Sequence, residues 1–259
     1  MGRKLHIDIF RHNPLDPDST PRMQTFVVEE YTSMTLFLAL THIRENLDPT
    51  VQFDFCCRAG ICGSCGMVIN GRPGLACHTR TADLPEHITL HPLPVFQLIG
   101  DLSVDTGTWF RNVGAKIESW VHTSKPFEAQ AQEERMSNEL ANNIFELDRC
   151  VECGCCVAAC GTALMRNDFI GATSINRLAR FYIDPRDERA PRDYYELVGD
   201  DNGVFGCMGL LACEDVCPKK IPLQDQLGIM RRMASLESVR GFIPQNLRDK
   251  FSCGCGGKH

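Results

Sequence analysis

The alternation of hydrophobic and polar residues at the start of the chain predicts a sheet with one helix packed against it. Residues 4–11 alternate apolar and polar side chains, and residues 25–30 form a second strand-like run after a turn rich in proline and aspartate. Leucine and isoleucine then recur at intervals of three and four over residues 36–47, which indicates a helix with one buried face.

Later signals in the same region complete a small β-rich domain. Asn70-Gly71 is a strong hairpin signal, because a tight hairpin turn needs two residues with positive φ. Residues 87–93 can form a closing strand. Two strands, a helix, a cysteine loop and further strands together predict a compact β-grasp domain over residues 1–100.

Beyond Pro94 the pattern becomes helical. Residues 106–121 place Trp109 and Trp120 on one helical face with Val113 and Ile117, and we expect both tryptophans to be core or interface anchors. A polar segment over residues 125–149 gains apolar residues at helical spacing from Met136, so it is interpreted as a linker running into a helix.

The remaining segments of the second half differ in composition. Residues 184–201 are densely charged and are predicted to be a solvated loop. We expect a helical domain over residues 101–240 and a separate cysteine- and glycine-rich tail over 241–259. Cys253 and Cys255 in that tail could bind a metal or form a redox pair, but a flexible end is the default interpretation.

Composition changes this picture through the cysteines. The chain has 259 residues and 15 cysteines, an odd number that falls in tight groups, which favours metal sites in a reducing compartment over a disulfide scaffold. The net charge of −6 argues against nucleic-acid binding. No apolar stretch approaches the roughly 18 residues needed to span a bilayer. The first residues lack the features of a signal peptide or a myristoylation site, so we expect folding in the cytoplasm.

The first cysteine group has the spacing of a plant-type ferredoxin. C-x4-C-x2-C with a distant fourth cysteine predicts a [2Fe–2S] cluster, whereas a zinc ribbon favours two CxxC pairs. Glycines in this loop allow tight turns and close approach of backbone N–H groups to sulfur. Cys56 falls outside the spacing and is interpreted as a packed neighbouring thiol. The four predicted ligands are Cys57, Cys62, Cys65 and Cys77.

The second and third groups follow the run of bacterial two-cluster ferredoxins, C-x2-C-x2-C-x3-C. In that run the fourth cysteine binds the other cluster. Crossing the fourth positions predicts a [4Fe–4S] cluster and a second cluster with three thiolates. The [4Fe–4S] ligands are then Cys150, Cys153, Cys156 and Cys217, and the other set is Cys160, Cys207 and Cys213.

Leu210 occupies the place of the missing cysteine in the third group. Leucine cannot bind iron, so the hypothesis is a [3Fe–4S] cluster that lacks the unligated iron. A four-iron cluster with water or another non-cysteine ligand stays open as an alternative. Cys155 lies between two ligands and is interpreted as a bystander, because Cys156 keeps the spacing.

Three clusters in one chain would conduct single electrons between two partners. The chain shows no nucleotide-binding fingerprint and no set of residues typical of a catalytic acid, base or nucleophile. We therefore expect no catalytic residues here, and we expect the substrate chemistry to reside on a partner subunit.

Three stretches closely resemble one family, the iron–sulfur subunits of succinate dehydrogenases and fumarate reductases, the complex II group. They are FDFCCRAGICGSCGMVINGRPGLAC, ELDRCVECGCCVAAC and GVFGCMGLLACEDVCPK, within a resemblance that spans roughly residues 3–235. The resemblance implies an α+β chain, in which a β-grasp plant-type ferredoxin domain precedes an all-α domain like the bacterial two-cluster ferredoxins.

The resemblance also implies partners and cofactors. A flavoprotein subunit with covalent FAD would interconvert fumarate and succinate, and a membrane-anchor cytochrome b subunit would carry quinone and haem b. Electrons would run from quinol through [3Fe–4S], [4Fe–4S] and [2Fe–2S] to FAD, or in reverse. The chain would lie peripherally on the cytoplasmic side of the inner membrane.

The chain looks most like the menaquinol:fumarate reductase branch of that family. Ubiquinone-using members typically have proline, tryptophan and histidine at the positions matched by Gly161, Met165 and Met208, so these residues favour menaquinone. Arg231 falls where the family has a basic residue near the quinone end, although solvation of a helix explains it equally well.

Two other functions remain open on the sequence alone. One is the same subunit operating in a succinate dehydrogenase, which no residue excludes. The other, from a different class, is a stand-alone ferredoxin-like carrier or a zinc-stabilised binding module.

Overall fold

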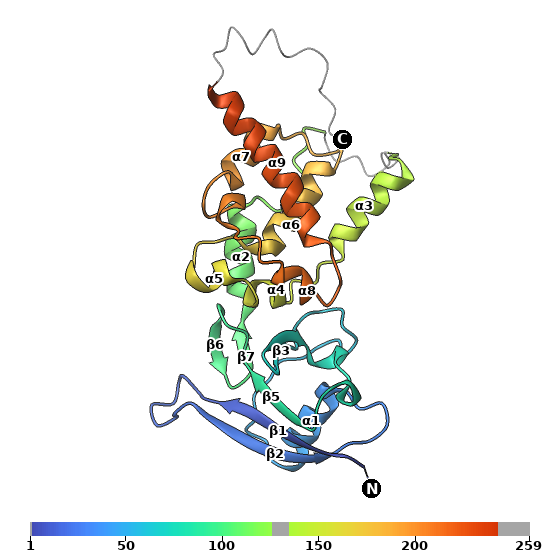
Figure 1. Cartoon of the computed structure of the whole chain (residues 1–259), viewed down its shortest axis with the longest axis vertical. Coiled ribbons are helices and arrows are strands. Elements are labelled where there is room, and N and C mark those ends of the chain that lie inside the picture. Colours follow the sequence, from blue (N-terminus) through green and yellow to red (C-terminus); the bar gives the residue numbers. More distant parts are fainter. Residues whose placement is uncertain (1, 126–134, 243–259) are drawn as a thin grey trace. The chain divides into compact units, whose positions relative to one another are not determined.

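The computed structural model describes residues 2–125 and 135–242 (Figure 1). The described chain divides into two compact units. Unit 1 comprises the described residues up to Arg111 together with Val151–Asn167 and Ala212–Lys220, and unit 2 comprises the remaining described residues. Three separate stretches of sequence thus build unit 1.

Unit 1 contains a five-stranded mixed sheet in the order β2-β1-β5-β3-β4. Strand β1 pairs antiparallel with β2 and parallel with β5, and β3 pairs antiparallel with both β4 and β5. With helix α1 against the sheet, this arrangement is the predicted β-grasp fold. The elements are β1 Lys4–Arg11, β2 Arg22–Glu29, α1 Leu36–Asn46, β3 Gly66–Ile69, β4 Arg72–Leu75 and β5 His87–His91.

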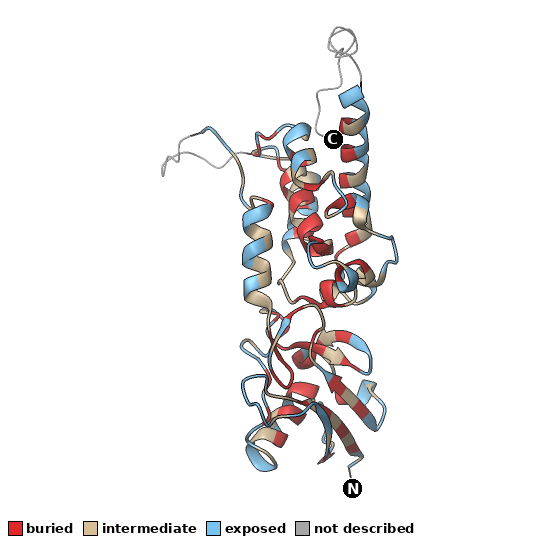
Figure 2. Ribbon diagram, turned by 90° about the vertical axis from the view of Figure 1, so that its left-hand side faces the viewer, coloured by how far each residue is buried: buried red, intermediate tan, exposed pale blue. Residues whose placement is uncertain are grey.

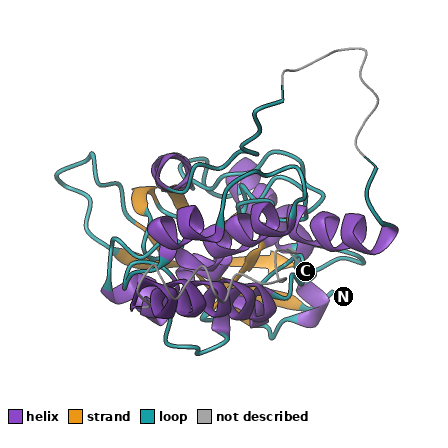
Figure 3. Cartoon of the chain, turned by 90° about the horizontal axis from the view of Figure 1, so that it is seen from above, coloured by secondary structure: helices purple, strands orange, loops and turns teal. Residues whose placement is uncertain are grey.

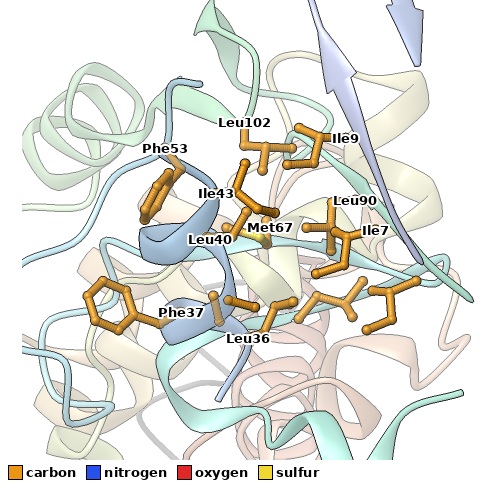
Figure 4. Packing of buried hydrophobic residues seen from close by; sticks show 14 of the residues in the cluster. Ile7, Ile9, Leu36, Phe37, Leu40, Ile43, Phe53, Met67, Leu90 and Leu102 are labelled. Atoms are coloured by element: carbon orange, nitrogen blue, oxygen red, sulfur yellow. The ribbon is translucent and has the colours of Figure 1, made fainter. Parts of the chain in front are cut away.

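The core of unit 1 is formed by hydrophobic residues that recur at every second position along β1 and at every third or fourth position along α1. Leu5, Ile7 and Ile9 alternate along β1 and are fully buried. Buried segments of the ribbon are red in Figure 2. The buried face of α1 presents Leu40 and Ile43 to the sheet residues (Figure 4). The helix begins where the Oγ of its N-cap residue, Thr35, accepts a hydrogen bond from the N–H of Leu38.

The predicted hairpin is present, with Asn70 and Gly71 at φ values of 49° and 79° between β3 and β4. The closing strand predicted over residues 87–93 is present as β5, and it lies at the centre of the sheet. A second hairpin, β6 Gln97–Gly100 with β7 Ser103–Asp105, was not predicted because both strands are very short.

The other regular elements of the described chain are helices, joined by loops and turns (Figure 3, helices purple, strands orange and loops teal). In unit 2, helix α6 packs against α3, α7 and α9. None of the helices within the described ranges is both long and apolar enough to cross a membrane. The helices are α2 Thr106–Lys116, α3 Asn138–Asp148, α4 Cys155–Ala158, α5 Gly161–Met165, α6 Gly171–Ile183, α7 Pro191–Val198, α8 Ala212–Asp215 and α9 Leu223–Phe242, with 3-10 turns η1 Ala76–His78, η2 Thr81–Asp83 and η3 Val204–Gly206.

Two predictions for the helical region need correction. The helix predicted over residues 106–121 ends at Lys116, so Trp120 lies beyond it, 53% exposed and stacked on His122. Trp120 is therefore not a core residue, and its alternative role as an interface anchor stays a prediction. The prediction of a solvated loop at residues 184–201 is also wrong, because this segment contains α7 and buried charges.

The charged segment at residues 184–201 contains two buried aspartates, Asp184 and Asp187. The Asp187 carboxylate accepts hydrogen bonds from the Arg189 guanidinium at 2.9 Å, from the Tyr194 hydroxyl at 2.8 Å and from the backbone N–H of His122 at 3.1 Å. Burial alone would raise the pKa of Asp187, but these hydrogen bonds outweigh it and hold the pKa below its usual range. The buried Asp187 carboxylate is thus paired inside unit 2 with one cation and two neutral donors.

This network predicts that the loss of Arg189 reduces local stability far more than the loss of Arg192 in the same segment. Arg189→Met leaves the Asp187 carboxylate buried without its cation, so we expect a loss of about 3–5 kcal/mol of local stability. Arg192→Met removes an exposed pair with Glu196 and should change stability by less than about 1 kcal/mol. Native-state hydrogen exchange of the α7 amides measures both losses, and equal exchange in the two variants would contradict the prediction.

Candidate cluster-binding cysteine loops

The first cysteine loop lies between α1 and β3 in unit 1. Cys57 and Cys62 are half-buried, whereas Cys65 and Cys77 are buried. Cys77 lies on η1, directly after β4, so the β3–β4 hairpin returns the chain to the loop. The sheet thereby brings Cys77, a predicted ligand distant in sequence, to the three predicted ligands that lie close together in the chain.

Backbone N–H groups are directed at the sulfur atoms of these cysteines. Cys57 Sγ accepts three such hydrogen bonds and Cys77 Sγ accepts one from Gly60. A sulfur that accepts several N–H donors is stabilised as a thiolate, the form that binds metal. The N-to-Sγ distances are Cys57 to Cys62 3.4 Å, Ala59 to Cys57 3.4 Å, Gly60 to Cys77 3.2 Å, Ile61 to Cys57 3.2 Å, Cys62 to Cys57 3.2 Å and Cys77 to Cys65 3.5 Å.

The loop needs glycine at defined points. Gly60 and Gly63 have φ values of 67° and 78°, a region that other residues avoid. A Cβ at Gly63 would lie 2.7 Å from the carbonyl oxygen of Val151 and 2.9 Å from the Cα of Cys153. The first loop and the start of the second cysteine run therefore approach each other backbone to backbone within unit 1.

The thiols of the first loop have very different acidities. Burial acts to raise the pKa of Cys62, but hydrogen bonds involving Ser64 and Cys57 outweigh it and lower the pKa to about 6. Burial raises the pKa of Cys65 to about 12, helped by the neighbouring sulfurs of Cys77 and Cys62. The hydrogen bonds thus favour the thiolate form of Cys62, whereas burial disfavours the thiolate form of Cys65.

The second and third cysteine runs contribute residues to both units. Cys153, Cys156, Cys160, Cys213 and Cys217 belong to unit 1, and Cys150 and Cys207 belong to unit 2. All seven are half-buried. In unit 1, helix α4 of the second run packs against α8 of the third run.

Cys153 and Cys155 differ in acidity, because one thiol donates a hydrogen bond to the other. The hydrogen bond from the Cys155 thiol lowers the pKa of Cys153 to about 7 in spite of burial, and the charge of Lys219 adds to the effect. The same hydrogen bond, together with burial, raises the pKa of Cys155, which is fully buried in the core of unit 1. Cys155 therefore remains a neutral thiol that packs.

The loop that carries Leu210 is shaped by two residues with positive φ, Gly209 at 68° and Leu211 at 65°. The N–H of Gly209 donates to Cys207 Sγ at 3.4 Å, and the Leu210 side chain is 66% exposed. Arg231 on α9 donates to the carbonyl oxygens of Val204 and Cys207, so its guanidinium holds this loop.

Several other sequence predictions can be placed. Cys56 is exposed, which contradicts its interpretation as a packed thiol. Cys253 and Cys255 lie outside the described residues.

Within the described ranges, no group of three or more histidine, cysteine, aspartate or glutamate side chains is arranged to hold one metal ion. The fit of the loops to clusters therefore rests on the thiolate chemistry and the directed N–H donors.

Two residues of these loops were missed by sequence reasoning. Ser64 forms a hydrogen bond with Cys62, and Lys219 donates from Nζ to the carbonyl oxygen of Gly60 at 3.2 Å. The position of Ser64 between two predicted ligands was a local signal for this hydrogen bond. Lys219 had no such signal, because its partner lies 159 residues away in the chain.

Comparison with known proteins agrees with the two kinds of cysteine loop. Residues 6–111 match the family described as 2Fe-2S iron-sulfur cluster binding domain, and residues 146–221 match the 4Fe-4S dicluster domain. The matched regions contain all eleven cysteines predicted as ligands.

Whole-chain relatives are similar over almost their full length. The fumarate reductase iron-sulfur subunit of Wolinella succinogenes is 58% identical over 233 residues, which cover 90% of this chain and 98% of that one. The succinate dehydrogenase iron-sulfur subunit of Bacillus subtilis is 28% identical, over 87% of this chain and 91% of that one. A chain of the solved Mycobacterium smegmatis Sdh1 complex in the apo form has a TM-score of 0.79 at 24% identity, over 95% of this chain and all of that one, and so shares the fold.

The close approach at Gly63 yields a test of the first loop. Gly63→Ala adds a steric overlap to the αL penalty of about 1–2 kcal/mol, so we expect loss of the cluster bound there. Gly71→Ala is the matched control, because Gly71 has φ of 79° with no atom within 4 Å of its Cβ position. EPR of the reduced protein should show the [2Fe–2S] signal in the control only, and an intact signal in Gly63→Ala would rule out this tight packing.

Proposed function

Because this chain belongs to the family of iron–sulfur subunits of fumarate reductases and succinate dehydrogenases, we propose that it conducts electrons between menaquinol and a flavoprotein subunit that reduces fumarate to succinate. The near full-length similarity to the Wolinella succinogenes subunit carries this proposal. The chain is a subunit of an oxidoreductase complex, and the reaction with fumarate is proposed to take place on the flavoprotein subunit.

The proposed ligand sets follow the cysteine spacing and the chemistry of the loops. Cys57, Cys62, Cys65 and Cys77 would hold the [2Fe–2S] cluster, supported by the N–H donors on their sulfurs. The [4Fe–4S] cluster would be held by Cys150, Cys153, Cys156 and Cys217, and the [3Fe–4S] cluster by Cys160, Cys207 and Cys213.

Bound clusters would supply one-electron acceptors whose potentials depend on cluster type, net charge, hydrogen bonds and exposure. The chain's own residues would supply the hydrogen bonds around the clusters. Backbone N–H groups neutralise thiolate charge in the first loop, and the Cys155 thiol donates to Cys153. Arg231 ties the carbonyl of Cys207 to α9.

Two partners follow from this role, a flavoprotein subunit with covalent FAD and a membrane anchor that carries quinone and haem b. An apolar surface around Cys207 in unit 2 supports a partner at this end. Phe205, Met208, Leu210 and Leu211 are between 41% and 66% exposed there, which is unfavourable in water and favours a covering protein. The chain would then lie peripherally on the cytoplasmic side of the inner membrane.

The quinone is proposed to be menaquinone, because Gly161, Met165 and Met208 replace the residues typical of ubiquinone-using members. Operation as a succinate dehydrogenase is the second candidate. It is favoured by the similarity to the Bacillus subtilis subunit, which has that name.

Leu210→Cys tests the three-iron site. A fourth thiolate at this position should retain the missing iron, so iron should rise from about nine to about ten atoms per chain and the oxidised three-iron EPR signal should disappear. Leu211→Cys adds the same thiol one residue away and should leave both quantities unchanged. A persistent three-iron signal in Leu210→Cys would mean that loop geometry, not ligand number, determines the cluster.

The function itself is tested on the intact membrane complex purified through this chain. We expect it to oxidise a menaquinol analogue with fumarate as acceptor faster than it reduces quinone with succinate. A faster succinate reaction would establish the succinate dehydrogenase alternative. Zinc without acid-labile sulfide, or an active chain without a flavoprotein, would exclude both.

A further inference from the structure

Lys219 connects the third cysteine run to the first cysteine loop within unit 1. Its Nζ donates to the carbonyl oxygen of Gly60 at 3.2 Å, and the side chain is half-buried. The residue directly follows Cys217 and Pro218, so the position of its backbone is tied to a proposed cluster ligand. Lys219, which lies next to a proposed [4Fe–4S] ligand in the chain, thus contacts the loop that is proposed to bind the [2Fe–2S] cluster.

The Gly60 carbonyl and the Ile61 N–H belong to one peptide unit. That N–H donates to Cys57 Sγ at 3.2 Å. A cation hydrogen-bonded to the carbonyl oxygen polarises the peptide and makes its N–H a stronger donor, because hydrogen bonds in a chain strengthen one another. The N–H of Gly60 itself donates to Cys77 Sγ at 3.2 Å. The carbonyl that Lys219 contacts therefore lies between donors to two proposed ligands.

We propose that Lys219 is a positioning residue that tunes the [2Fe–2S] centre through the Gly60–Ile61 peptide. The inference rests on the ligand set proposed above. Lys219 contributes to the centre in two ways: it fixes the orientation of this peptide, and it places a positive charge behind the N–H that faces Cys57. No sulfur needs to contact the lysine for either effect.

The sign of the effect follows from charge. Reduction adds one electron to a centre already surrounded by thiolates, so both a stronger N–H donor and a nearby cation favour the reduced form. Loss of Lys219 should therefore disfavour reduction. Lys219→Arg keeps the charge and a donor and should restore the original behaviour in large part.

The experiment compares three variants of the assembled complex by EPR-monitored redox titration. At a fixed solution potential, Lys219→Met should lower the ratio of reduced to oxidised [2Fe–2S] about tenfold, which corresponds to about 59 mV for a one-electron couple. Lys220→Met is the matched control, because it removes the same charge from the exposed next residue. It should change the ratio less than about twofold, as should Lys219→Arg.

Resonance Raman spectra provide a second readout, since a weaker N–H···S bond to Cys57 should shift the iron–cysteine stretching bands in Lys219→Met only. An unchanged ratio in Lys219→Met, or an equal change in Lys220→Met, would overturn the inference. If Lys219→Met does not retain the centre, Lys219→Gln is titrated with the same expected direction, and loss of the centre in both would overturn the tuning role. Absence of a [2Fe–2S] spectrum in the unaltered complex would instead refute the ligand set.

Discussion

The structure depends on bringing backbone N–H groups to cysteine sulfur. Thiolates are poorly solvated once half-buried, and the N–H groups of the first loop replace the lost water. Three donors converge on Cys57 alone, which is possible only because the loop turns sharply at Arg58, Gly60 and Gly63 with positive φ. The convergence of these donors therefore requires a loop backbone with positive φ values, and Gly60 and Gly63 adopt such values without strain.

That requirement extends beyond the loop into the rest of unit 1. Gly63 lies so close to the backbone of Val151 and Cys153 that no side chain fits between them. In the same unit, Lys219 of the third cysteine run donates a hydrogen bond to the carbonyl oxygen of Gly60. Unit 1 is consequently built from three stretches of sequence, because the cysteine runs pack on the β-grasp core.

Local signals were sufficient to predict most of the β-grasp domain. Strand β1, helix α1 and the Asn70-Gly71 hairpin each depend on residues close in sequence. The central place of β5 could not be predicted, because alternation identifies the buried face of a strand but not its neighbours, and β5 pairs with β1 across some eighty residues. The charged segment at 184–201 was misjudged for a related reason. Its carboxylates are satisfied partly by the backbone of His122, which composition does not reveal.

Cluster chemistry constrains spacing, so candidate ligands can be proposed from the sequence, whereas the residues proposed to tune the clusters cannot. Spacing favours Cys156 over Cys155 as a proposed ligand, and in the structure Cys155 is buried in the core, where its thiol donates to Cys153. Electron transfer changes the charge of a centre without moving the chain, so donors oriented in advance stabilise the new charge with little rearrangement. A lysine held against a carbonyl and a thiol held against a neighbouring sulfur are both donors of this kind. Their orientation comes from tertiary packing, and only the folded chain reveals it.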